Sequence, residues 1–258
     1  MQVFDYHLNP KLKRDVNFQS FYFQPEDQEQ EKLGSLIIVG ELNNFLSKDK
    51  KLLDQLANKI KKEFYSNTKQ ESKEALNNAL GEANVYLKSI AEQDSQRWLG
   101  NLHLAIVNIK DYNIHFSKSG NIKMLLLRGR EYIDIADNLE SQHSDAKKYF
   151  SSVASGNLVP DDKVIIITQY LTKFFETYLA NHLLNLESFT NKKIDKFIRD
   201  KKEEMKEFCG VLLIVLVNKE NIKKHLLRYF LPRTKTKKKI TLILLFILLL
   251  LFCYLIYR

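Results

Sequence analysis

The chain has 258 residues, with 40 Lys or Arg against 31 Asp or Glu and a formal net charge of +9. Nine of the basic residues and none of the acidic ones lie from residue 221 onward, so the first 220 residues hold 31 of each sign and are neutral overall. A nucleic-acid-binding domain needs a basic face of its own, and this distribution argues against one. The two cysteines, Cys209 and Cys253, are too few and too far apart for a disulfide framework or a thiolate metal site.

The first half of the chain predicts strands followed by helices. Apolar and aromatic runs at 18–24 and 35–42 predict two strands separated by an acidic loop that contains a proline. Apolar side chains then recur at helical spacing over 52–64 and 75–91, which predicts two amphipathic helices. Residues 1–15 contain no apolar stretch of the kind that a secretory signal requires, so the folded part is expected to remain in the cytoplasm.

The second half predicts a strand-rich stretch and then a repeat of the helical pattern. Short polar turns between apolar runs predict an antiparallel meander with strands at 102–109, 114–117, 122–127 and 131–135. After a loop at 136–162, the pattern predicts a strand at 164–168, helices at 171–183 and 194–198, and a last strand at 211–217. This order favours an α+β fold, an antiparallel β-sandwich flanked by helix pairs, with the strands at 164–168 and 211–217 central and buried.

The order and spacing of these elements over 15–218 resemble the metal-dependent protein phosphatases of type 2C, the PPM family. Residues 35–44 lie where the family has an apolar strand ending in Asp-Gly-x-Gly, and 114–125 resemble its strand, Gly-Asp-Ser turn and strand. Residues 162–175 are similar to its segment Gly-Asp-x-Leu-Leu-Leu-x-Ser-Asp-Gly-Leu-Thr, and 208–216 lie where Asp-Asn-x-Thr opens the last strand. Convergent αββα patterning is the alternative that the sequence leaves open.

The metal-binding positions that this resemblance implies are degenerate. Family members hold two Mg²⁺ or Mn²⁺ ions with Asp carboxylates, and a bridging water attacks the phosphoester. The corresponding residues here are Glu41, Gly120, Gln169 and Cys209. Hard divalent cations need largely anionic oxygen ligands, so we expect no metal, no cofactor and no catalytic residue, and an ordinary polar role for Glu41. The register near Arg14 is too loose to assign the family's phosphate-contacting arginine.

The C-terminal region predicts a membrane anchor. Residues 240–257 are an apolar run interrupted by one Thr, and as a helix they would span about 27 Å, close to the thickness of a bilayer core. The run is preceded by a basic cluster that favours a cytoplasmic position by the positive-inside rule: Arg233, Lys235, Lys237, Lys238 and Lys239. A buried core helix is the alternative. Residues 221–231 are amphipathic and fit either an interfacial helix or the last helix of the domain.

These observations predict a phosphatase-like domain at 1–218, a basic juxtamembrane segment at 219–239 and a single-pass transmembrane helix at 240–257. The leading functional hypothesis is a membrane-anchored pseudophosphatase that acts as a cytoplasmic binding or regulatory module in signalling. Its expected partners are the lipid bilayer and a protein of unknown identity. The alternatives are an active metal-dependent Ser/Thr phosphatase with rewired ligands, which alone would need Mg²⁺ or Mn²⁺, and an unrelated tail-anchored adaptor.

Overall fold

The computed structural model describes residues 1–13, 15–93, 98–139, 149–186 and 189–218. Met1–Val217 form one compact unit. The predicted transmembrane helix at 240–257, the juxtamembrane cluster and Arg14 lie outside the described residues. Among those residues, no helix combines the length and the apolar character needed to cross a membrane.

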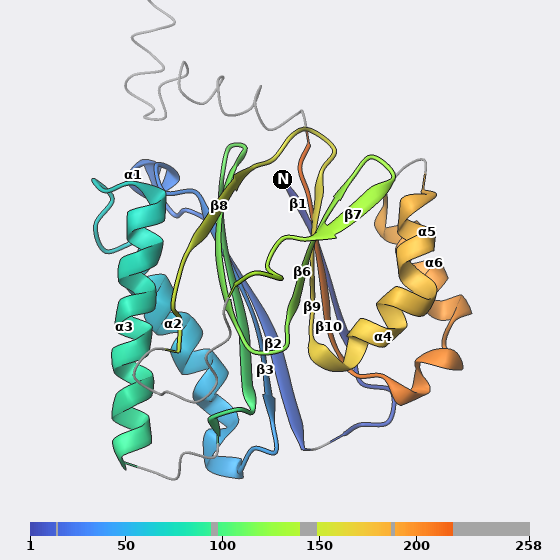
Figure 1. Cartoon of the computed structure of the whole chain (residues 1–258), viewed down its shortest axis with the longest axis horizontal. Coiled ribbons are helices and arrows are strands. Elements are labelled where there is room, and N and C mark those ends of the chain that lie inside the picture. The colour runs from blue at the N-terminus through green and yellow to red at the C-terminus, as the bar shows by residue number, and fades with distance from the viewer. Residues whose placement is uncertain (14, 94–97, 140–148, 187–188, 219–258) are drawn as a thin grey trace, which may run out of the picture. The chain divides into compact units, whose positions relative to one another are not determined.

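Two five-stranded antiparallel sheets pack face to face, as Figure 1 shows. The first sheet has the order β1 (Gln2–Leu8), β10 (Gly210–Leu216), β9 (Lys163–Ile167), β6 (Lys123–Arg128) and β7 (Glu131–Asp134). The second has the order β2 (Val16–Phe23), β3 (Ser35–Asn43), β4 (Leu102–Lys110), β5 (Asn113–Ser119) and β8 (Ala154–Asn157). The predicted β-sandwich is therefore confirmed, with β9 and β10 inside their sheet and buried along almost their whole length.

Helices cover the outer face of each sheet (Figure 1). The second sheet is covered by α2 (Leu52–Phe64) and α3 (Ser72–Gln93), and the short α1 (Gln28–Glu31) lies in the predicted loop between β2 and β3. The first sheet is covered by α4 (Thr172–Phe174), a π-helical turn at Phe175–Leu179, α5 (Ala180–Leu184) and α6 (Asn191–Asp200). Short 3-10 turns complete the fold at Ser47–Lys51, Gln169–Leu171 and Glu204–Glu207.

The alternation of side chains along each strand produces three apolar layers. In β3, Leu36 and Ile38 face the α2–α3 layer, whereas Ile37 and Val39 face the layer between the sheets. Successive side chains of a strand point to opposite faces, and both faces of this sheet are covered. The continuous apolar run in β3 is the pattern expected of a strand that is buried on both sides.

Three details of the sequence interpretation were wrong. The stretch 102–135 is not one meander, because β4–β5 form a hairpin in the second sheet and β6–β7 a hairpin in the first, with the chain crossing between sheets at Gly120. The edge strand β1 was not predicted, since polar residues break its apolar pattern. Strand β8, within the predicted loop 136–162, has no apolar signal and is defined only by its pairing with β5.

Candidate functional site

Strand ends from both sheets meet at one end of the sandwich. Glu41 lies near the end of β3, directly opposite His103 of β4 in the strand register. Thr168 directly follows β9, and Cys209 directly precedes β10. Thr168 is bonded to β10 at Val211, whose amide donates to the Thr168 hydroxyl at 2.9 Å and whose carbonyl accepts from the Thr168 amide at 3.1 Å.

Side-chain alternation directs the polar residues into the space between the sheets. Glu41 continues the face of β3 that carries Ile37 and Val39, and His103 continues the face of β4 that carries Ala105. Glu41 is fully buried and His103 is 3% exposed. A polar cluster therefore closes the inter-sheet apolar layer at this end.

Glu41 lies in an environment that disfavours its charged form. Its Oε1 accepts a hydrogen bond from Asn43 Nδ2 at 3.1 Å, while Oε2 is buried without a hydrogen bond of ordinary length. Burial raises the pKa of Glu41, and the opposing effects of the Asn43 amide, the Thr168 hydroxyl, the Gln169 main chain and the Lys13 charge are weaker. The carboxyl group is thus held toward its neutral form.

The other three predicted positions are Gly120, Gln169 and Cys209. They lie at the same end of the sandwich, and none of them supplies an anionic ligand. Burial raises the pKa of the Cys209 thiol, with the negative charges of Glu41 and Asp15 acting in the same direction. Gly120 has a φ of +81°, and a Cβ placed there would lie 2.2 Å from His103 Nδ1. The Asn121 amide donates to that nitrogen at 3.3 Å. Gly120 stands where the resemblance places a family Asp, and the space beside it that a side chain would need is occupied by the His103 imidazole.

These residues do not fit the pair of hard cations that the resemblance implies. The cluster offers one desolvated carboxyl, a neutral amide and a protonated thiol, and two Mg²⁺ or Mn²⁺ ions need several anionic oxygens to offset their dehydration. Among the described residues, no group of three or more His, Cys, Asp or Glu side chains could hold a metal ion. No catalytic step follows from this donor set.

Several members of the cluster carry no recognisable signal in the sequence. His103 follows from the register of β4 against β3, and Thr168 from the pairing of β9 with β10. Lys13 comes from the segment between β1 and β2, and its ammonium lies 5.0 Å from the centre of the Tyr170 ring. Only Asn43, two residues after Glu41 on the same strand, could have been found from the sequence, by side-chain alternation.

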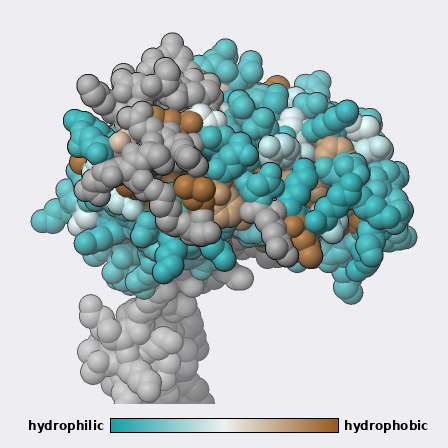
Figure 2. Space-filling view, turned by 90° about the horizontal axis from the view of Figure 1, so that it is seen from below, coloured by the Kyte–Doolittle hydropathy of each residue, from teal (hydrophilic) through white to brown (hydrophobic). Residues whose placement is uncertain are grey.

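The rim of this end carries exposed apolar side chains. Leu12 is 76% exposed, Tyr170 40% and Leu46 38%, and each lies in a segment that leads into or out of one of the converging strands. Figure 2, which views the domain from below relative to Figure 1, shows a mostly hydrophilic described surface with some hydrophobic residues toward the middle of the view. Large apolar side chains that are exposed together can form part of a surface that binds another protein.

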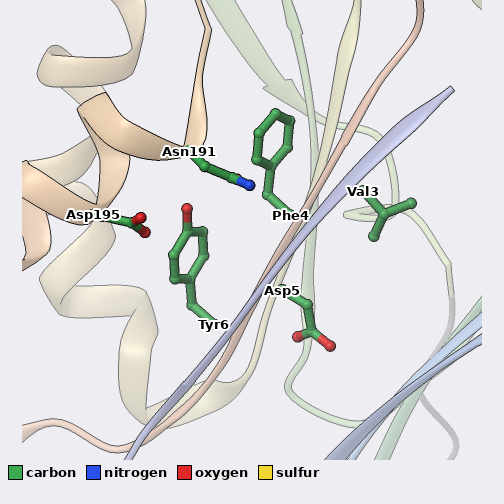
Figure 3. Close-up of a pocket in the computed structure, with 6 residues that line it drawn as sticks. All are labelled: Val3, Phe4, Asp5, Tyr6, Asn191 and Asp195. Atoms are coloured by element: carbon green, nitrogen blue, oxygen red, sulfur yellow. The ribbon is translucent and has the colours of Figure 1, made fainter.

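Away from the polar cluster, a recess lies along β1, where this edge strand meets α6. It has a volume of about 200 Å³ and is lined by Val3, Phe4, Asp5, Tyr6, Asn191 and Asp195. Figure 3 shows the Tyr6 hydroxyl extending toward Asn191 and Asp195. Burial, together with the Asp195 charge, raises the pKa of Tyr6. None of the predicted site residues lines this recess.

Comparison with solved structures relates this architecture to known domains. The serine/threonine phosphatase of S. agalactiae is 14% identical, with a TM-score of 0.60 over 84% of this chain and 98% of that chain. The SiaA-PP2C domain of Pseudomonas aeruginosa is 13% identical, with a TM-score of 0.58 over 82% of this chain and 84% of that chain.

The PP2C phosphatase domain and regulatory fragment of SpoIIE from Bacillus subtilis is 13% identical, with a TM-score of 0.55 over 84% of this chain. The match spans 61% of that SpoIIE chain. No family model and no curated protein sequence matches the chain. The two antiparallel sheets, their outer helices and these structural matches together show that the chain has the fold of the PP2C-type, PPM-like protein phosphatase domains.

Proposed function

We propose that this protein is a catalytically inactive PP2C-like domain, anchored to a membrane by its C-terminal segment, that acts as a cytoplasmic binding or regulatory module. One observation supports the proposed absence of catalytic activity. Where β3, β9 and β10 meet, Glu41 is the one carboxyl at the four degenerate positions, and it is fully buried with a raised pKa. A bridging metal hydroxide needs two ions held by charged oxygens, and this cluster does not provide them.

The role in binding is supported by the surface around the cluster. Leu12, Leu46 and Tyr170 are exposed apolar side chains, and the Lys13 ammonium lies over the Tyr170 ring. Mixed apolar and cationic surfaces of this kind suit a protein partner, because aromatic and aliphatic anchors supply most of the affinity of an interface. The partner would bind without being hydrolysed.

The membrane attachment is supported by the sequence alone. The apolar run 240–257 has the length of a transmembrane helix, and the basic residues before it favour the cytoplasmic side. A binding domain attached by a transmembrane helix would meet its partner at the bilayer surface.

An active metal-dependent Ser/Thr phosphatase with rewired ligands is the second candidate. It is favoured by two buried acceptors, Glu41 Oε2 and Asn43 Oδ1, neither of which has a hydrogen bond of ordinary length. Oxygens of this kind are the ligands that Mg²⁺ and Mn²⁺ prefer. The third candidate, an unrelated tail-anchored adaptor, is disfavoured by the PP2C-like fold.

The two phosphatase hypotheses are separated by assaying the full chain purified in a mild detergent. We expect no Mn²⁺- or Mg²⁺-dependent hydrolysis of p-nitrophenyl phosphate or of a phosphoserine peptide above the protein-free rate. Calorimetry is expected to show no micromolar binding of two Mn²⁺ ions. The inactive assignment fails if turnover is measured and Glu41→Ala abolishes it while Glu176→Ala, at an exposed glutamate on the helical layer of the first sheet, does not.

A further inference from the structure

The turn Asn9–Lys13, which follows β1, is closed on itself by three hydrogen bonds. The Lys13 amide donates to Asn9 Oδ1 at 2.9 Å, and Asn9 Nδ2 donates to the Lys13 carbonyl at 3.1 Å. The Leu12 amide donates to the Asn9 carbonyl at 3.1 Å. The Asn9 side chain therefore holds the two ends of the turn together.

The same turn is fastened to the converging strand ends on the first sheet. The Lys11 ammonium forms an ion pair with Glu207, two residues before Cys209. The Lys13 ammonium lies over the Tyr170 ring, directly after Gln169. These two contacts join the turn to the segments that lead into β10 and out of β9.

A third attachment joins the following residues to the second sheet. The Asn44 amide donates to the Asp15 carbonyl at 2.8 Å, beside the buried Asn43. Asp15, two residues after the turn, is thus tied to the end of β3, next to the pairing of β2 with β3. The turn itself contacts the segments that lead into β10 and out of β9.

The backbone of the turn is held in a conformation that its sequence does not favour. Leu12 has a φ of +50°, in the left-handed region that a residue with a Cβ rarely adopts, and its side chain is 76% exposed. A left-handed leucine is strained, and an exposed leucine gains little from burial. The contacts made by Asn9, Lys11 and Lys13 hold the turn in this conformation.

From this arrangement we infer that the Asn9–Lys13 turn is a latch over the polar cluster, and that its release opens access to Glu41 and Cys209. Both residues are at most 1% exposed in the closed form. The positive charge of Lys13 also acts on both groups, lowering the pKa of each against the effect of burial. As a control on partner access the latch rests on the proposed function, but the opening itself can be measured without a partner.

Cys209 is a reporter for this opening. The chain has two cysteines, so the full chain with Cys253→Ser in detergent carries a single thiol, whose reaction with Ellman's reagent is followed by absorbance. Asn9→Ala removes both side-chain hydrogen bonds of the turn and is expected to raise the labelling rate about tenfold. Lys11→Gln breaks an exposed ion pair and is expected to raise it about two- to fivefold.

Matched substitutions away from the turn serve as controls. Lys201→Gln breaks an ion pair with Glu204, and Asn185→Ala removes a side-chain bond to the Asn181 carbonyl, so both are expected to leave the rate unchanged. The urea dependence of labelling separates local from global opening, because its slope scales with the surface exposed. A shallow slope in the Asn9→Ala protein supports the latch.

The inference is overturned if Asn9→Ala and Lys11→Gln label at the parent rate. It is also overturned if labelling follows the slope of global unfolding in every variant. Detection of phosphatase turnover would refute the proposed function and leave this result intact, since the labelling assay measures access and not catalysis.

Discussion

Glu41 and His103 stand opposite each other in the paired strands β3 and β4, and both side chains are buried between the two sheets. The imidazole of His103 also occupies the space beside Gly120, where a Cβ would be only 2.2 Å away. The His103 side chain therefore takes up space within the cluster, and burial disfavours the charged form of the Glu41 carboxyl.

The first prediction concerns the pH dependence that Glu41 imposes on stability. The pKa of Glu41 is raised above its ordinary value of 4.5 by burial, so the folded state binds more protons than the unfolded state above that pH. Stability should therefore fall as pH rises from about 4.5 through the folded pKa. Glu41→Gln removes this loss and should raise the melting temperature at pH 8, where each 1 kcal/mol gained corresponds to about 2–4 °C.

The same substitution should have a smaller effect at pH 4, where the wild-type carboxyl is mostly protonated in both states. Thermal melts across pH 4–8 measure the difference between the two proteins. A wild type that is more stable than Glu41→Gln at pH 8 would show that the carboxylate has a stabilising partner.

The second prediction uses three glycines that differ in φ and in surroundings. Gly120→Ala combines a left-handed φ of +81° with a clash against His103 and should cost at least about 3 kcal/mol. Gly129→Ala has a φ of +62° with open space around it and should cost about 1–2 kcal/mol. Gly81→Ala, exposed on α3, should stabilise by about 0.5–1 kcal/mol. Urea unfolding gives the three values, and equal losses at Gly120 and Gly129 would argue against the close packing of His103.

The third prediction concerns the buried carboxylate of Asp162. It accepts two hydrogen bonds from Arg128, at 3.0 and 2.7 Å, and one from the Val159 amide at 2.7 Å. Because Asp162 is 1% exposed, Asp162→Ala leaves the Val159 amide without its acceptor and removes two of the Arg128 hydrogen bonds, and it should cost about 2–4 kcal/mol. Lys206→Gln, in an exposed ion pair with Glu203, is the control and should change stability by less than about 1 kcal/mol. Similar denaturation midpoints for both variants would contradict the prediction.

The fourth prediction concerns membrane topology. If 240–257 span the bilayer with the basic cluster on the cytoplasmic side, the folded domain faces the cytoplasm. Protease added to intact cells or spheroplasts should then spare the domain and digest it only after lysis. Deletion of 240–257 should move the protein from the membrane fraction to the soluble fraction. Digestion in intact cells would reverse the proposed orientation.

Much of the fold was predictable because its strongest elements carry their own periodicity. The apolar runs of β3, β9 and β10 and the helical spacing of α2 and α3 are local patterns, and they led to the correct sandwich. Strands β1 and β8 were missed because polar residues interrupt the apolar pattern of β1 and β8 has almost no apolar residues. The division of β4–β5 and β6–β7 between two sheets was also missed, because a short polar turn looks the same within a sheet and between sheets.

The sequence by itself determined the types of residue available at the degenerate positions, Glu41, Gly120, Gln169 and Cys209, and the charge imbalance confined to the region from 221 onward. It also specified the αββα order, since hydrophobic periodicity is a local property. Only the tertiary structure decided that His103 fills the space beside Gly120 and that Glu41 is desolvated. It also decided that the Asn9–Lys13 turn contacts the segments next to β9 and β10. Desolvation and contacts between distant segments depend on how the sheets pack, and no single segment of sequence contains that information.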